Sequence, residues 1–186
     1  MSGNMRHDRR VARTRGALID AYNRLFLGRR RGPFRVAEVV SEAEIGRSTF
    51  YEHYRGIDDI FLEALKRPFA ALADGAAGTG DAALLEPVLA HFWENRQRGR
   101  EALGGRLGER VARLLADMVE ERIAGAAFSL PPRLAARTLA EAGLAPLRSW
   151  IAGEATATAA QLSAAICRIG IALRSALYAP QVQSAR

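Results

Sequence analysis

Apolar residues recur at intervals of three and four positions along almost the whole chain, the spacing that gives an α-helix one apolar side. Leu18, Tyr22 and Leu25 show it near the start, and Ile166, Ile169 and Leu173 show it near the end. No stretch alternates apolar and polar residues over a useful length, so strands are not expected. The sequence therefore predicts an all-α fold.

Helical segments are predicted between glycine- and proline-containing turns. Pro87 is expected to lie in the first turn of its helix or to kink it, and Pro146 is expected to interrupt another. The last helix is predicted to begin with a capping box, in which Thr158 and Gln161 satisfy each other's backbone amides. The segments are 14–28, 35–43, 47–54, 56–72, 84–99, 107–128, 131–153 and a final helix after residue 158.

Composition shifts divide the chain into five parts. Residues 1–12 are basic and are expected to form a flexible arm, and residues 13–73 form the first helical domain with its connecting helix. Residues 74–81, DGAAGTGD, contain no large apolar side chain and are expected to be a linker. A second helical domain is predicted over 82–180, followed by a tail at 181–186.

Composition also limits the compartment. Hydrophobic residues make up 49% of the chain, enough for a true core. No apolar run approaches the roughly 20 residues needed to span a bilayer, and no apolar segment follows the basic N-terminus. We therefore expect a cytoplasmic protein that does not enter membranes. Cys167 is the single cysteine, and a buried structural role is favoured over a redox role.

The positive charge points to a polyanionic partner. The net charge is +7, and residues 1–67 hold 14 basic against 9 acidic residues, so most of the excess lies in the first third. Arg29, Arg30 and Arg31 fit a solvated loop and a phosphate-contacting loop equally well.

The segment IGRSTFYEHYRGIDDIF, from Ile45 to Phe61, identifies the kind of polyanion. A short helix from about Arg47 to Tyr54, preceded by a turn and another short helix, is a helix-turn-helix candidate. Its apolar side would anchor it to the domain, and its other side would enter the major groove of DNA. The expected anchors are Ile45, Phe50 and Tyr54.

The exposed side chains of this helix suit different parts of DNA. Arg47 has the fork geometry to bind guanine O6 and N7 together, and Thr49 offers a methyl group to thymine or a hydroxyl group to phosphate. Ser48 is compatible with several bases. Tyr51 and His53 are expected to donate hydrogen bonds to the sugar-phosphate backbone, and Arg55 adds a cation at the end of the helix.

Residues 13–65 resemble the TetR-type bacterial transcriptional regulators. TRGALIDAYNRLF is similar to the family's first helix, RVAEVV to its second, and STFYEHY to the core of its recognition helix. The resemblance implies that Arg47, Ser48 and Thr49 face the bases or the groove. It likewise implies that Tyr51 and His53 contact phosphates.

Three positions depart from the family pattern. Arg35 replaces the usual capping threonine of the second helix and offers an additional DNA contact. Glu44 replaces a glycine or asparagine of the turn, where a left-handed conformation would cost about 1 kcal/mol. Ile57 replaces a lysine near the phosphates.

The resemblance also implies a homodimer whose second domain binds a small-molecule effector. Its last two helices would pair with those of the partner subunit, placing two recognition helices about 34–36 Å apart on a palindromic operator. Effector-pocket candidates are Phe92, Trp93, Met118 and Trp150, although core packing is the favoured explanation for all four. Dimer-interface candidates are Leu162, Ile166, Ile169, Leu173 and Leu177.

Catalysis is the least favoured function. His7, His53 and His91 are scattered, and no pair of carboxylates stands at helical spacing with a histidine to make a metal or acid–base site. No enzyme activity, metal or cofactor is therefore expected. The favoured hypothesis is a ligand-responsive repressor that binds double-stranded DNA. The alternative is an architectural or degenerate family member that binds DNA without sequence preference or mediates protein interactions.

Overall fold

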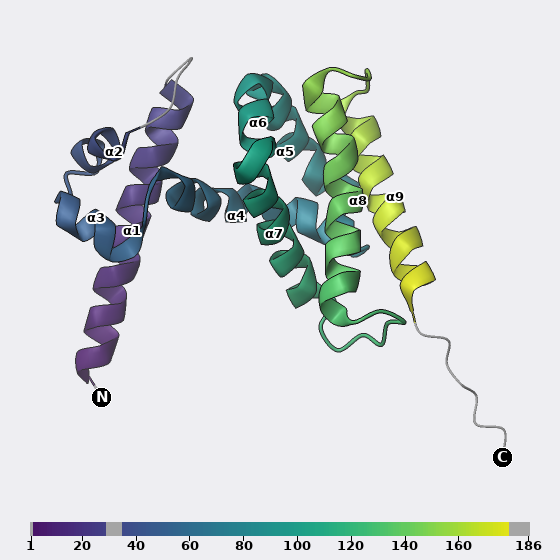
Figure 1. Ribbon diagram of the computed structural model, residues 1–186, viewed down its shortest axis with the longest axis horizontal. Helices are drawn as coiled ribbons and strands as arrows, with labels where there is room; N and C mark the ends of the chain where they lie inside the picture. The colour runs from purple at the N-terminus through teal and green to yellow at the C-terminus, as the bar shows by residue number, and fades with distance from the viewer. Residues whose placement is uncertain (1, 29–34, 179–186) are drawn as a thin grey trace. The chain divides into compact units, whose positions relative to one another are not determined.

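The computed structural model describes residues 2–28 and 35–178, and within them it contains nine helices (Figure 1). The one β-type pairing in these ranges is an isolated bridge between Phe128 and Tyr178, so the all-α prediction is confirmed. Arg29 to Arg31 and the predicted tail at 181–186 lie outside the described residues. The helices are α1 (Ser2–Gly28), α2 (Val36–Glu42), α3 (Arg47–His53), α4 (Ile57–Ala76), α5 (Ala82–Glu94), α6 (Arg96–Leu103), α7 (Gly105–Arg122), α8 (Pro132–Ala152) and α9 (Ala159–Leu177).

The first compact unit ends at Lys66 and contains α1, α2, α3 and the first half of α4. Its core is aromatic where α1 meets α4, with the rings of Tyr22 and Phe61 6.4 Å apart between centroids. On the other side of α1, the Arg24 Nε atom donates to the Glu42 carboxylate at 2.7 Å and fixes the end of α2. The buried apolar residues include Leu18, Ala21, Val39, Phe50 and Ile60.

The predicted flexible arm is instead part of α1, which begins at Ser2 and runs for 27 residues. Arginine and alanine are good helix formers, and no proline interrupts residues 2–28. The packed part of α1 around Leu18 also supplies a formed helical turn, so that extension toward the N-terminus needs no new nucleation. The many charged side chains of residues 7–13 therefore do not prevent this segment from forming a helix.

The second compact unit starts at Arg67 and contains the rest of α4 and helices α5 to α9. Within it α7 packs against α8, and α9 packs against both α5 and α8. Side chains from each of these helices are fully buried, so one core joins the whole unit. Among the largest are Leu85, Leu89, Leu115, Leu139, Leu144 and Leu147.

The predicted linker or loop at 74–81 is correct only in part: residues 77–81 connect α4 to α5, but the beginning of the segment lies in the core. Ala76 and Ala77 are buried, and α4 continues to Ala76. A Cβ atom added to Gly170 of α9 would lie 2.1 Å from the carbonyl oxygen of Gly75, so the two backbones touch. The segment lacks large side chains because there is no room for them. The division between the units falls inside α4, at Lys66 and Arg67.

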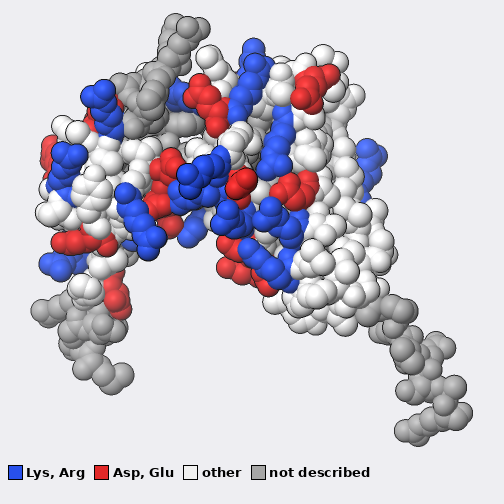
Figure 2. Space-filling model, in the orientation of Figure 1, with Lys and Arg blue, Asp and Glu red and all other residues white. Residues whose placement is uncertain are grey.

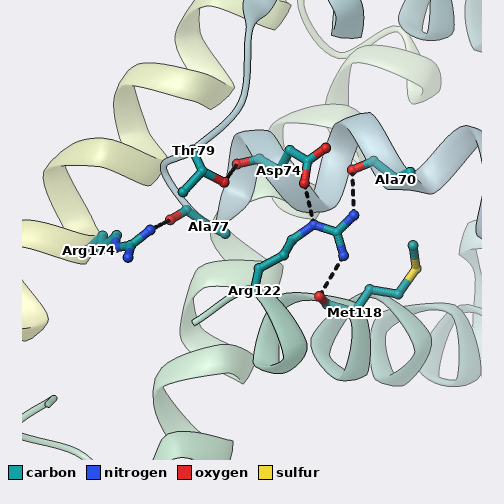
Figure 3. Close-up of polar contacts among 7 residues, drawn as sticks. All are labelled: Ala70, Asp74, Ala77, Thr79, Met118, Arg122 and Arg174. Carbon is teal, nitrogen blue, oxygen red and sulfur yellow. Dashed lines mark hydrogen bonds and ion pairs between the residues drawn. The ribbon is translucent and has the colours of Figure 1, made fainter. Parts of the chain in front are cut away.

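Arg122, the last residue of α7, ties α7 to the end of α4 within the second unit (Figure 3). Its Nε atom pairs with the Asp74 carboxylate, its Nη1 atom donates to the Met118 carbonyl at 2.7 Å, and its Nη2 atom donates to the Ala70 carbonyl at 3.2 Å. One residue past α4, the Ala77 carbonyl accepts from Arg174 of α9 at 3.1 Å. Two arginines therefore fix the C-terminal end of α4 from neighbouring helices.

Several predicted helix boundaries differ from the structure; the helix predicted over 107–128, for example, ends at Arg122. The segment 84–99 is divided at Asn95, where α5 ends and α6 begins. Pro146 lies inside α8 without ending it, as Pro87 does in α5, so neither proline interrupts its helix. The capping box of α9 is confirmed: Thr158 Oγ1 accepts from the Gln161 amide at 3.1 Å, and Gln161 Oε1 accepts from the Thr158 amide at 2.9 Å.

Candidate nucleic-acid interface

The helix α3 is held on the first unit by its aromatic side. Phe50 is fully buried, and Tyr54, which ends the helix, is 4% exposed. Their rings lie 5.6 Å apart between centroids, and the Tyr51 ring meets Phe50 edge-on at 5.4 Å. Ile45 is half-buried in the preceding turn. All three predicted anchors therefore face the domain, with Phe50 at the centre.

The turn between α2 and α3 has the left-handed conformation that the sequence predicted at Glu44, whose φ is 55°. The amide of Ala43 donates to the Val39 carbonyl at 2.9 Å, and the amide of Ile45 donates to the Val40 carbonyl at 3.0 Å. These bonds close the end of α2 and direct the chain into α3. They hold Glu44 in a conformation that a side chain with a Cβ atom disfavours.

Replacing Glu44 with glycine is expected to stabilise the protein by about 0.5–1 kcal/mol. The substitution removes the left-handed strain, and the greater freedom of glycine in the unfolded chain offsets part of the gain. Chemical denaturation monitored by circular dichroism measures the change. Glu86→Gly, at an exposed position inside α5, is the control and should instead destabilise by about 1 kcal/mol. Equal effects at both positions would show that the turn carries no strain.

The opposite side of α3 is available to a partner. Arg47, Ser48 and Arg55 are exposed, and Tyr51 is 52% exposed. The predicted contacts Thr49 and His53 are half-buried at the edge of this surface. Across the described residues, the guanidinium groups of Arg47 and Arg55 form no ion pair, so both cations are free to meet an anion.

Arg35 lies at the start of α2, where its exposed side chain forms no cap. A guanidinium group has no acceptor and cannot bond the free amides of the first turn. Glu38 supplies half of the capping box, because its carboxylate accepts from the Arg35 amide at 2.8 Å. The Arg35 side chain is therefore left for another role, consistent with an added DNA contact.

An ion pair between α1 and α4 supports the C-terminal end of α3. Arg15 of α1 pairs with Glu63 of α4 at 3.0 Å, and its guanidinium carbon lies 5.9 Å from the centre of the Tyr54 ring. Burial raises the pKa of the Tyr54 hydroxyl group, which stays neutral at physiological pH. From the sequence, Arg15 was grouped with the N-terminal arginines, for which a flexible arm on DNA and a soluble tail were both open, and a supporting role under α3 was not predicted. Its spacing with Leu18 and Tyr22, at i+3 and i+7, is the signal that could have placed it.

The effector-pocket candidates separate into packing pairs. The Trp93 and Trp150 rings stack at 4.7 Å, and the Trp150 Nε1 atom donates to the Ala157 carbonyl at 2.9 Å. Phe92 instead meets Phe69 edge-on at 5.9 Å. Met118 is half-buried on α7. The structure thus brings two of the four candidates together, and Trp150, at 4% exposure, serves the core.

Two of the dimer-interface candidates are wrong. Leu162 and Ile166 point into their own subunit, with exposures of 6% and 0%. Ile169 is exposed, and Leu173 and Leu177 are half-buried. The helical period identified an apolar side of α9 but not whether that side faces its own core or a partner. Cys167 is buried beside Gly75, and burial raises the pKa of its thiol, as expected of a structural cysteine.

The helix α9 also departs from the expectation of no membrane-spanning segment. By length and composition it is apolar enough to cross a bilayer, and 28% of its apolar window is buried inside the described structure. Its buried residues lie on the side that packs against α5 and α8. The exposed side of α9 is mainly apolar and includes Ile169, Ile171 and Ala172, with Arg168 as an exposed charge.

No protein-family model matches the sequence, and no curated protein matches it. Solved structures do match. A TetR transcriptional regulator from Streptococcus agalactiae 2603V is 22% identical, with a TM-score of 0.50 over 90% of this chain and 99% of that chain. The dihydroxyacetone kinase operon activator DhaS is 18% identical, with a TM-score of 0.51 over 89% and 98%. The chain therefore has the fold of the TetR-type transcriptional regulators.

Proposed function

We propose that the protein is a DNA-binding transcriptional regulator that recognises its operator with α3. The observation that carries the proposal is the two-sided character of this short helix. Buried Phe50 and Tyr54 fix it to the domain, while Arg47, Ser48 and Tyr51 are exposed and unoccupied by other parts of the described chain. A fixed helix with small and cationic side chains at its leading end fits the major groove.

The contacts are expected to divide between bases and phosphates. Arg47, at the first position of α3, is placed to read guanine, and Ser48 and Thr49 permit close approach to the neighbouring bases. Tyr51, His53, Arg55 and Arg35 would bind the backbone and fix the register of the helix in the groove. Ile57, which opens α4, cannot donate to a phosphate.

A homodimer would use the sparsely charged surface of α8 and α9, which we call the α8–α9 face; exposed Arg168 lies one helical turn before Ala172 on this surface. Figure 2 shows few charged side chains over these two helices. A second copy of the chain would cover this face and bring two α3 helices onto one palindrome. Such a dimer, acting on DNA, would work in the cytoplasm. The face consists of Leu134, Ala142, Ala145, Ile169, Ala172 and Ala176, with Leu173 and Leu177 at its edge.

An effector would act from the second unit by favouring one spacing of the two α3 helices. A ligand that binds both arrangements equally would change nothing, so an effector must prefer one of them by a few kcal/mol. Phe92, Trp93 and Met118 are the half-buried candidates for its contacts. Repression remains our proposal for the outcome, although one of the similar structures is named as an operon activator.

Substitutions of Arg47 and Tyr51 should affect DNA binding in different ways. Arg47→Ala removes a bidentate base contact and is expected to cost about 1–3 kcal/mol at one base pair, which relaxes specificity there. Tyr51→Phe removes a phosphate contact and should weaken all sequences alike, by about 1 kcal/mol. Fluorescence anisotropy with a selected duplex and its single-base variants measures both effects.

Arg113→Ala is the matched control, because Arg113 is an exposed arginine of the second unit with a long 3.9 Å ion pair to Glu109. It should leave DNA binding unchanged. Wild-type affinity in both α3 variants would refute the assignment of this helix.

A competition titration distinguishes a sequence-specific regulator from a protein that binds DNA without sequence preference. A specific regulator should prefer its selected duplex to random DNA by about 10³-fold or more at physiological salt. An architectural protein would show a far smaller ratio with the same strong dependence on salt. The missing phosphate donor at Ile57 makes this comparison worthwhile, since it weakens the sequence-independent part of binding.

A further inference from the structure

The first half of α1 extends beyond the packed core of the first unit. The first fully buried residue of α1 is Leu18, and Arg15 makes the contacts with Glu63 and Tyr54 described above. Residues 2–14, which we call the α1 extension, precede these contacts. From residue 7 onward its described side chains are exposed, apart from half-buried Val11 and Thr14. At 1.5 Å per residue the extension is about 18 Å long.

The extension carries cations that have no partner among the described residues. Arg9, Arg10 and Arg13 are exposed, and the described residues offer none of them an ion pair. Asp8 is the one carboxylate in the extension sequence. Arg9 and Arg13 stand at i and i+4, where like charges repel and slightly destabilise a helix. A polyanion would remove this repulsion.

The α1 extension begins next to the C-terminal end of α3. Arg15 lies against Tyr54, at the C-terminal end of α3, and Arg55 is exposed one residue later. Figure 1 shows α1 continuing past α3 from this level toward the N-terminus. With α3 in a major groove, a rod of about 18 Å starting here would cover about five further base pairs.

We propose that the α1 extension is a second DNA-contacting element, a preformed helix that binds the phosphates flanking each half-site through Arg9, Arg10 and Arg13. The proposal rests on the DNA-binding function proposed for α3. A helix that is already formed loses less conformational entropy on binding than a flexible arm of equal charge. The extension would therefore lengthen the footprint without adding base-specific contacts.

Flank length and salt provide the test. A duplex is first selected by the full-length protein from a randomised library with fixed flanks of about 10 base pairs, and then a form with flanks of about 2 base pairs is prepared. We expect the wild-type protein to lose at least about 10-fold in affinity on trimming. The triple variant Arg9→Gln, Arg10→Gln, Arg13→Gln should bind both duplexes alike. On the long duplex, its salt slope should be smaller by about 2.7 per protomer, 0.9 for each lost phosphate contact.

Two further variants keep the test specific. Arg106→Gln, Arg113→Gln, Arg137→Gln lowers the net charge equally within the second unit and should retain the effect of flank length. Ala12→Pro keeps the arginines but breaks the extension helix, and should lose most of the effect. An unchanged flank effect in Ala12→Pro would overturn the preformed helix.

The two proposals fail in distinguishable ways. A preferred duplex bound without dependence on flank length, or a triple variant with wild-type salt slope, would overturn the role of the extension alone. The absence of any preferred duplex would overturn sequence-specific recognition by α3. Circular dichroism of each variant confirms that the domain core around Leu18 remains folded.

Discussion

Gly170→Ala is expected to destabilise the second unit by about 3 kcal/mol or more, because a Cβ atom at this position has no room. It would lie 2.1 Å from the carbonyl oxygen of Gly75 and 2.9 Å from that of Ala76. Both obstacles are backbone atoms, and they belong to the segment at the end of α4 that Arg122 and Arg174 also hold. A side-chain rotation cannot relieve the clash, so α4 and α9 must separate.

Urea denaturation followed at 222 nm measures the loss. Gly16→Ala is the matched control, since Gly16 also lies inside a helix but a Cβ atom there meets nothing within 4 Å. The control should stabilise the protein by about 0.5–1 kcal/mol through helix propensity. A Gly170→Ala protein with the unfolding free energy of the wild type would show that α4 and α9 do not touch in solution.

Ala172→Glu is expected to abolish the proposed dimer and to reduce affinity for the proposed palindromic duplex by at least about 100-fold. Ala172 is exposed in the middle of the α8–α9 face, where a second copy would have to cover the new carboxylate. Two carboxylates meeting across a two-fold interface would be both desolvated and mutually repelled. Each monomer would then hold a single half-site and lose the advantage of paired binding.

Sedimentation and DNA titration with the same protein check this result. Ala83→Glu, at an exposed position in the first turn of α5, adds the same charge away from the α8–α9 face and should leave a dimer. An Ala172→Glu protein that remains dimeric would show that the two subunits meet elsewhere. A folded monomer with unchanged affinity for the palindrome would show that α3 acts alone.

Helix α3 was the part of the candidate site that the sequence predicted best. Phe50 and Tyr54 are four positions apart, so they lie on the same side of a helical turn. Their large aromatic rings make that side the one expected to be buried, as it is. The left-handed turn at Glu44 was expected only from the family resemblance, because a glycine or asparagine is common at this position. The support from Arg15 did not follow as readily, because a single arginine in a basic segment gives no sign that it pairs with a distant carboxylate.

Small residues account for the main errors. The segment 74–81 contains no large apolar side chain, yet Ala76 and Ala77 are buried because two backbones come close together. Counting apolar bulk cannot distinguish such a contact from a solvated linker. Ile166 and Ile169 posed a related problem, since both belong to the apolar part of α9 while one faces the core and the other is exposed. Only the positions of α5 and α8 decide between them.

The stacked indoles give the protein a built-in optical reporter. The sequence holds two tryptophans, and both belong to the stacked pair Trp93 and Trp150. Native emission therefore arises from a single place in the second unit, where the Arg96 guanidinium carbon also lies 4.8 Å from the centre of the Trp93 ring. A small molecule that disturbs this stack would shift the tryptophan emission spectrum of the unlabelled protein. Unknown effectors can thus be screened in a cuvette before any operator is known.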